Sequence, residues 1–474
     1  MPFDISNNHI ATIFRAAASK HASEQWRIIY KQPAALAALL LVGLHQCIVA
    51  SSTIFLTSTI DKFQSNQEYH HLLYAYLIAM AIPYVPGCAS FVYLQKWINE
   101  SHRALVSSFV ADMRRNPQRH SDKAFCDRVI AVLSRNSFSV IRDYASFIHD
   151  LASFTLNSIL SMAVIGFLLP PRLVWGYFLS LALCFMVVAS LRKVIAVESS
   201  TCEYSYVKYS DVLNKGWANI TIGNRHNEDI WKEQRQITGR SFYSPSSRLE
   251  IYKQIGNILL AGASLVPTIY LIVSIVRDGA TDAYVIAAVI VSLTRIFLII
   301  NSLSSLVYRV LDYSAMRARL DVLFETKSML SSSSHCTGKI GTIRINGKSV
   351  SSIDEILEIL TGAKRGRFTI TGENGSGKST ALLTLKRIYG DGCFLLPVHH
   401  ADLLWRSTIP GQSTGQRILA CLDEILNIDD LKYILLDEWD ANLDPLNAAT
   451  IDSALDAIAK TKTVIEIHHL RSQT

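Results

Sequence analysis

The chain has 474 residues, of which 50% are hydrophobic and only 18% are charged. Soluble globular proteins carry about 25% charged residues, so the composition excludes a disordered chain, a fibrous repeat and a small disulfide scaffold. It favours a membrane protein with a soluble part attached. The net charge of +7 does not indicate a nucleic-acid partner, because most of the excess lies in two segments beside apolar stretches. The eight cysteines are scattered without metal-ligand spacing and indicate free thiols.

Six stretches are long enough to cross a lipid bilayer, which requires about 20 apolar residues. They lie at approximately residues 33–57, 71–95, 147–169, 173–191, 255–276 and 283–308. Lysine and arginine concentrate in segments 96–142 and 192–253, whereas the opposite loops contain only Lys62, Arg172 and Arg277. Because basic loops stay on the cytoplasmic side, we expect a multi-pass protein of the cytoplasmic (inner) membrane with its N- and C-termini in the cytoplasm.

The two basic segments keep an apolar period near 3.6 residues, which predicts helices that continue beyond the membrane. With the six spans they form an all-α transmembrane domain over residues 1–330. After a serine-rich boundary, β-rich runs alternate with helical stretches, which predicts an α/β domain over residues 338–474. The predicted strands are Thr342–Asn346, Arg367–Thr371, Tyr433–Leu436 and Thr463–Ile467.

Residues 372–379 read GENGSGKS and fit the pattern G-x-x-x-x-G-K-[ST] between a predicted strand and a predicted helix. In such a loop the backbone N–H groups surround phosphate oxygens, the lysine reaches the β- and γ-phosphates, and the last hydroxyl binds Mg²⁺. A glycine-rich turn with a solvated lysine is the alternative. The candidate nucleotide-binding residues are Gly372, Asn374, Gly375, Ser376, Gly377, Lys378, Ser379 and Thr380, and Ser379 is also a candidate metal ligand.

Two carboxylates follow the apolar strand Tyr433–Leu436. Open α/β sheets bind ligands at the carboxyl ends of their strands. Asp437 can hold Mg²⁺ there, and Glu438 can orient and deprotonate an attacking water. An acidic strand end that caps the next helix is the alternative, and the nearby phosphate-loop pattern disfavours it.

Three further motifs complete a series: Ser413-Thr-Gly-Gln416, Ala441-Asn-Leu-Asp-Pro445 and Thr463-Val-Ile-Glu-Ile-His-His469. In this order the motifs resemble the P-loop ATPase domain of an ABC transporter, and the whole chain resembles an exporter-type half-transporter. The resemblance implies that Ser413 and Gly415, with Gln416 beside them, contact ATP held by a second subunit. It also implies that Asp444 lies in the loop linking the two active sites and that the catalytic residue His469 holds the γ-phosphate.

The sequence departs from the family pattern at three places. Only 34 positions separate Ser379 from Ser413, so the helical subdomain is shortened. Val398, His399 or His400 stands where the family has a loop glutamine. No aromatic residue occurs at Thr342–Val350, where the family stacks one on adenine.

The resemblance implies a homodimer in the lipid bilayer that binds ATP and Mg²⁺ and couples hydrolysis to export of a small molecule or peptide, with an antimicrobial peptide or natural product as the leading substrate. A flippase for a lipid or lipid-linked compound is the nearest alternative. Another alternative is a protein that hydrolyses little ATP, either as an ATP-binding membrane sensor or as one half of a heterodimer. Polar residues within the spans can line a substrate cavity or serve structural pairing; the candidates are Arg295, His45, Gln46 and Asn301.

Overall fold

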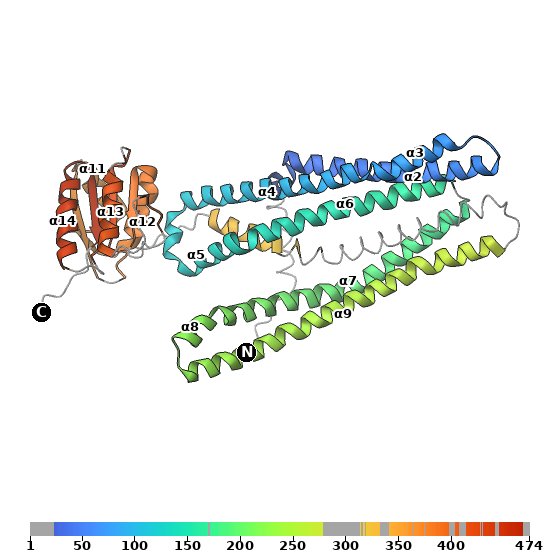
Figure 1. Cartoon of the computed structure of the whole chain (residues 1–474). Helices are drawn as coiled ribbons and strands as arrows, with labels where there is room; N and C mark the ends of the chain where they lie inside the picture. The colour runs from blue at the N-terminus through green and yellow to red at the C-terminus, as the bar shows by residue number, and fades with distance from the viewer. Residues whose placement is uncertain are drawn as a thin grey trace. The chain divides into compact units, whose positions relative to one another are not determined.

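Figure 1 shows a computed structural model of the chain, which describes residues 23–168, 171–277, 313, 316–317, 319–331, 341–363, 365–373, 375–397, 403–406, 414–426, 428, 430–440 and 445–467. The chain divides into two compact units. The first comprises Met1–Val106 and Val132–Glu325, and the second comprises Ser107–Ala131 and Thr326–Thr474. The short segment 107–131 therefore packs with the C-terminal part of the chain.

The first unit consists of helices. They are a π-helical turn, Trp26–Tyr30, followed by α2 (Pro33–Gln64), α3 (His70–Ala81), α4 (Tyr84–Arg115), a second π-helical turn, Ala131–Asn136, α6 (Ser137–Leu168), α7 (Pro171–Asn214), α8 (Gly216–Thr221) and α9 (Arg225–Arg277). The end of α4 enters the second unit, where a 3-10 turn (η2, Pro117–Ser121) and α5 (Lys123–Ile130) follow. The prediction that helices extend through the basic segments is confirmed for the described residues.

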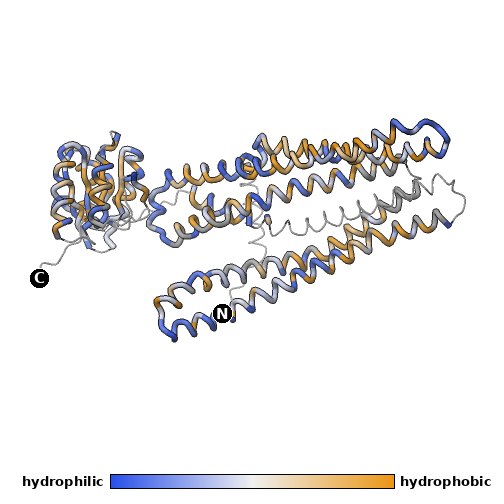
Figure 2. The backbone as a smooth tube through the Cα atoms, in the orientation of Figure 1, coloured by the Kyte–Doolittle hydropathy of each residue, from blue (hydrophilic) through white to orange (hydrophobic). Residues whose placement is uncertain are grey.

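Two stretches of helix are long and apolar enough to cross a membrane by length and composition, in a search of the described residues: Pro33–Gln64 and His70–Arg115. Only 33% and 28% of their most apolar windows are buried, whereas a core helix of a soluble protein is mostly buried. Their outward apolar side chains include Leu36 and Leu40, each 64% exposed. Figure 2 shows the apolar residues along α2 and α3. These two helices suggest a membrane protein.

The other predicted spans stay predictions. Residues 147–168, 173–191 and 255–276 lie within α6, α7 and α9, and the predicted sixth span, 283–308, lies outside the described residues. The predicted positions of both termini in the cytoplasm also stay predictions, as does the domain division at residues 330 and 338.

Polar contacts hold the first helices together. Proline lacks an N–H group and interrupts the helical hydrogen bonds. The helical stretch is interrupted at Pro83, between α3 and α4. His45 Nδ1 of α2 lies 2.8 Å from the Pro83 carbonyl oxygen. A Cβ atom at Gly87 would lie 2.9 Å from the same ring nitrogen, so a glycine at this position lets α2 approach α4.

The second unit contains a six-stranded sheet with the order β2-β1-β3-β6-β5-β4. The strands are β1 (Ile343–Ile345), β2 (Lys348–Val350), β3 (Gly366–Thr371), β4 (Cys393–Leu396), β5 (Tyr433–Asp437) and β6 (Thr463–Ile467). β3, β6, β5 and β4 are parallel, and the β1–β2 hairpin adds antiparallel strands at one edge. Asn346 and Gly347 form the hairpin turn with φ of 48° and 85°, as expected for an Asn-Gly turn.

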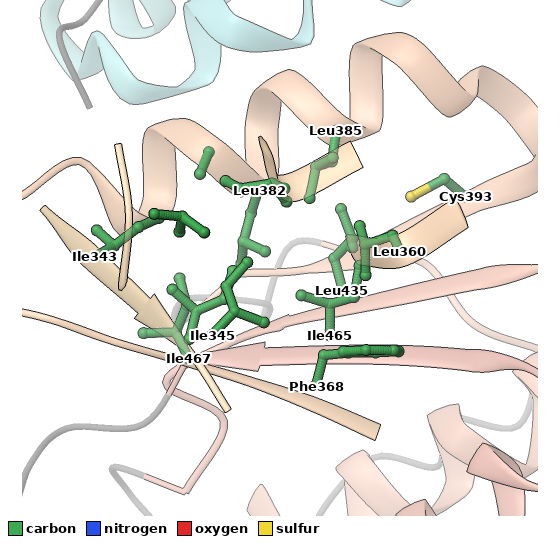
Figure 3. Close-up of a cluster of buried hydrophobic side chains, with 14 residues drawn as sticks. Ile343, Ile345, Leu360, Phe368, Leu382, Leu385, Cys393, Leu435, Ile465 and Ile467 are labelled. Atoms are coloured by element: carbon green, nitrogen blue, oxygen red, sulfur yellow. The ribbon is translucent and has the colours of Figure 1, made fainter. Parts of the chain in front are cut away.

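Helices cover both faces of this sheet. On one face, α11 (Ile353–Gly362) and α12 (Lys378–Tyr389) pack against Leu435, Ile465 and Ile467, as Figure 3 shows. On the other, α13 (Thr414–Leu426) and α14 (Pro445–Ala459) pack against alternate residues of the same strands, such as Ile434 and Val464. Strands buried on both faces read as continuous apolar runs, which explains why β5 and β6 are evident in the sequence.

The four predicted strands are confirmed as β1, β3, β5 and β6, with small differences at their ends. Two strands were not predicted, β2 and β4, whereas α11 lies in the first of the helical stretches predicted between the β-rich runs. β2 has three residues, and only Val350 among them is buried, so it carries little apolar periodicity.

Candidate functional site

Parallel register brings three strand ends to one edge of the sheet. Ile370 of β3 pairs with Ile467 of β6, and Ile467 also pairs with Asp437 of β5. The loop after β3 and the carboxylates after β5 therefore leave the sheet at the same level, on either side of β6. This is the edge at which α/β sheets bind ligands.

The loop after β3 has the backbone of an anion site. Gly375 and Gly377 have φ of 81° and 90°, a region that side chains disfavour. Gly377 caps α12, whose N-terminal N–H groups point toward the loop and favour anions. Lys378 is 8% exposed, and its Nζ donates to the carbonyl oxygens of Gly372 at 2.8 Å and Glu373 at 3.1 Å. These carbonyls hold the ammonium group within the loop.

The polar groups at this edge fit Mg²⁺. Asp437 Oδ1 and Ser376 Oγ are buried and have no hydrogen-bond partner among the described residues. Mg²⁺ takes oxygen ligands and commonly binds through one or two carboxylates plus substrate phosphates. Ser379 and Asp437 supply a hydroxyl and a carboxylate oxygen of this kind, and the unpartnered Oδ1 is an observation that favours an ion or its water there.

The environment of Asp437 disfavours its charge. Burial raises the pKa of Asp437 above its ordinary value of 3.8. A hydrogen bond from Ser379 opposes the rise, the charge of Glu438 adds to it, and Lys378 again opposes it. A divalent cation that binds to this carboxylate would supply the positive charge that stabilises its ionised form.

Glu438 stands in a strained turn at the end of β5. Its φ is 48°, which costs a residue other than glycine about 1–3 kcal/mol and persists only where the surroundings impose it. Its backbone N–H donates to the Ile467 carbonyl oxygen at 3.2 Å. The strain marks this position as a candidate functional residue.

A charged network lies behind the site. Arg367 of β3 donates from Nε and Nη2 to the carboxylate of Glu466 in β6, at 2.7 and 2.9 Å. It also donates to Asp452 and Asp456 of α14. Burial lowers the pKa of Arg367, but its hydrogen bonds to these carboxylates outweigh burial and the net shift is upward. The guanidinium is therefore charged.

Sequence reasoning missed this network, together with Trp439, whose Nε1 donates to Glu466 Oε2 at 3.1 Å. A signal was present, because Arg367 and Glu466 are single charges in otherwise apolar strands. Such charges need partners when buried.

The structure brings only some of the predicted site residues together. Gly372, Gly375, Ser376, Gly377, Lys378, Ser379 and Thr380 lie in the loop and at the start of α12, and Asp437 and Glu438 lie at the end of β5. Gly415 and the exposed Gln416 lie in the first turn of α13. Asn374, Ser413, Asp444 and His469 lie outside the described residues, as do Val398, His399 and His400. The roles assigned to all of them stay predictions.

The predicted cavity residues make helix contacts. Gln46 is buried and its Nε2 donates to Ser153 Oγ of α6 at 3.0 Å, and His45 contacts the Pro83 carbonyl oxygen. Arg295 and Asn301 lie outside the described residues. The substrate cavity therefore stays a prediction.

Comparison with known proteins gives a likeness in structure alone. No family model matches the sequence, and a search of curated proteins finds no match. Among solved structures, a bacterial Atm1-family ABC exporter with ATP bound is similar over 92% of this chain and 91% of its own, with a TM-score of 0.60 and 14% sequence identity. At this identity the likeness concerns the fold. The chain has the fold of an ABC exporter.

Proposed function

We propose that this chain is one half of a homodimeric, ATP-driven exporter that moves a small molecule or peptide across the cytoplasmic membrane. The observation that carries the proposal is the alignment, at one sheet edge, of the Lys378 loop with Asp437 and Glu438. The exposed apolar stretches Pro33–Gln64 and His70–Arg115 and the likeness to an ABC exporter support the transport part.

The residues have separable roles in ATP hydrolysis. The loop N–H groups and Lys378 bind the phosphates, which places the γ-phosphorus near the end of β5. Ser379 and Asp437 would hold Mg²⁺, which neutralises charge on the β- and γ-phosphates. Glu438 orients a water molecule and accepts its proton as the water oxygen attacks the γ-phosphorus, and the bond from that phosphorus to the leaving oxygen of ADP breaks.

Hydrolysis then drives the helical unit between inward and outward access. The proposed second copy supplies Ser413 and Gly415 to the ATP held by the first, and Asp444 links the two sites. His469, two residues after Ile467 of β6, contacts the γ-phosphate. An antimicrobial peptide or natural product is the substrate class we favour.

ATP hydrolysis by the purified full chain in lipid nanodiscs tests the proposal. We expect Mg²⁺-dependent turnover in the wild type and a loss of about 10²-fold or more in Glu438→Gln, because a positioned general base contributes about 10²–10⁴-fold. Binding of a fluorescent ATP analogue should be retained in Glu438→Gln, since the phosphate loop is unchanged, and lost in Lys378→Ala.

Two outcomes contradict the proposal. Equal and near-zero turnover in wild type and Glu438→Gln, with ATP binding intact, supports a sensor or a heterodimer half. Turnover stimulated by lipid or a lipid-linked compound and by no peptide or soluble small molecule supports a flippase. Uptake of peptides into inverted vesicles separates the transport outcomes directly.

A further inference from the structure

Trp439 follows Glu438 directly and is fixed by two kinds of contact. Its side chain is 6% exposed and packs in the core that also includes Leu436 and Leu455. Its indole Nε1–H donates to Glu466 Oε2 at 3.1 Å. The ring is thus held both by apolar packing and by a directed hydrogen bond to β6.

Glu466 is a rigid anchor for that hydrogen bond. It is 2% exposed, and its Oε1 also accepts from Thr369 Oγ1 at 3.2 Å and from Arg367 Nε at 2.7 Å. Arg367 Nη2 occupies the other oxygen at 2.9 Å. Among the described residues, four hydrogen-bond donors surround this carboxylate, so it cannot turn without breaking several of these bonds.

Arg367 is held in turn by α14. Its Nη2 donates to Asp452 Oδ1 at 2.5 Å and its Nη1 to Asp456 Oδ1 at 2.8 Å. Hydrogen bonds and ion pairs therefore connect Trp439 through Glu466 of β6 and Arg367 of β3 to α14. Glu466, which accepts the hydrogen bond from Trp439, therefore lies in a strand of the sheet and not in a loop.

β6 thus tethers the turn after β5 on both sides of the strained residue. Ile467 accepts the backbone N–H of Glu438, and Glu466 accepts the indole of the residue that follows. A residue with φ of 48° relaxes unless its neighbours hold it.

We propose that Trp439 is a positioning residue, which through its bond to Glu466 holds the left-handed backbone of Glu438 and aims that carboxylate at the attacking water. The inference rests on the proposed ATP hydrolysis.

Trp439→Phe tests this inference, because phenylalanine keeps an apolar ring and removes the indole N–H. We expect kcat for ATP to fall about tenfold or more, since small displacements of a catalytic group have effects up to about 10²-fold. KM should change less than about twofold, because the substitution leaves Lys378 and the phosphate loop unaltered. Trp405→Phe is the matched control: Trp405 Nε1 is buried with no hydrogen-bond partner among the described residues, and kcat should be unchanged.

A second measurement separates positioning from a merely structural role. In a Glu438→Gln background, Trp439→Phe should cause no further loss of kcat, because residues that act through one group are not additive. Three outcomes would overturn the inference. They are a loss of kcat in the Glu438→Gln background as large as that in the wild type, an unchanged kcat in Trp439→Phe alone, and a fall in thermal stability that matches the loss of activity.

Hydrogen exchange gives a readout that does not depend on activity. The Glu438 amide donates to Ile467, so Trp439→Phe should speed its exchange severalfold while the amides of β5 stay protected, and Trp405→Phe should not. If the wild type does not hydrolyse ATP, the proposed function fails. Faster exchange at Glu438 would then still support the tether, whereas unchanged exchange would refute it.

Discussion

At the scale of residues, the burial of Asp437, the proposed Mg²⁺ ligand, has a cost to stability. Because burial raises its pKa in the folded state above the ordinary value of 3.8, the folded chain binds more protons than the unfolded chain at pH values between the two pKa values. Stability therefore falls as pH rises through the window between the unfolded and folded pKa, and the whole cost is present above that window. Above that window the ionised carboxylate destabilises the protein, and the proposed binding of a cation would offset this cost.

We expect Asp437→Asn to raise the apparent Tm of the nucleotide-free protein at pH 7, because it removes this charge. The gain should shrink as the pH falls through the raised pKa of Asp437, because the native carboxyl then becomes protonated. Mg²⁺-dependent hydrolysis should fall about 10²-fold or more, because metal binding supplies several kcal/mol of charge stabilisation. Melting curves across pH 4 to 7 check the first part, and a Tm that is equal or lower in the variant at pH 7 would contradict it.

The candidate site could be predicted in part because its chemistry is local in sequence. The loop at Gly372–Ser379 and the pair Asp437–Glu438 are contiguous motifs whose residue types specify phosphate and cation binding. The contact of Trp439 with Glu466 joins residues 27 positions apart, and Arg367 lies 99 positions from Glu466. Only the strand order, with β6 between β3 and β5, brings these residues together, and periodicity does not specify strand order.

At the scale of elements, a buried ion pair within the second unit joins the end of α4 to the helical segment 319–331. Lys327 Nζ lies 2.8 Å from Asp112 Oδ2, and their side chains are 5% and 11% exposed. Asn116 Nδ2 and Arg119 Nη2 donate to carbonyl oxygens of the helical segment 319–331. By contrast, the pair of Arg114 and Asp391, which links α4 to the turn after α12, is exposed. Both pairs lie within the second unit.

We expect Lys327→Met to destabilise the second unit by about 3–5 kcal/mol, because it leaves the buried Asp112 carboxylate without its cation. The double variant Lys327→Met with Asp112→Leu should recover most of that loss, since an apolar pair of similar volume is often neutral. Denaturant unfolding of the four members of this cycle gives the coupling. A loss in the double variant as large as that of Lys327→Met would contradict the prediction.

The matched control is Asp391→Asn, which removes the exposed partner of Arg114. Exposed ion pairs contribute little, because solvent and salt screen them, so unfolding should shift only slightly. The sequence could not distinguish the two pairs, because both join charges more than 200 positions apart and their difference lies in burial alone.

At the scale of the whole molecule, the hairpin of α7 and α9 exposes apolar side chains outside the predicted membrane spans. The two helices pack along each other, and Figure 2 shows apolar residues along both. Between the predicted spans 173–191 and 255–276, exposed apolar residues continue into the segment that we expect in the cytoplasm. They include Tyr206, Trp217, Ile220, Ile222, Ile237 and Tyr243, with exposed fractions from 50% to 83%. Apolar patches of this kind mark protein interfaces, and the proposed homodimer gives them a partner.

We therefore expect the purified protein in nanodiscs to contain two chains of 52.8 kDa, and the double variant Trp217→Asp with Ile222→Asp to shift the population toward one. These side chains are 79% and 83% exposed, so the change affects the isolated chain little, while a buried unpaired charge disfavours the dimer.

The control is Phe63→Asp, at an exposed position near the loop after α2, which should leave two chains. Because each proposed ATP site uses residues of both copies, ATPase activity should fall with the dimer fraction. Mass photometry with parallel ATPase assays measures both, and full activity from single chains would refute the homodimer.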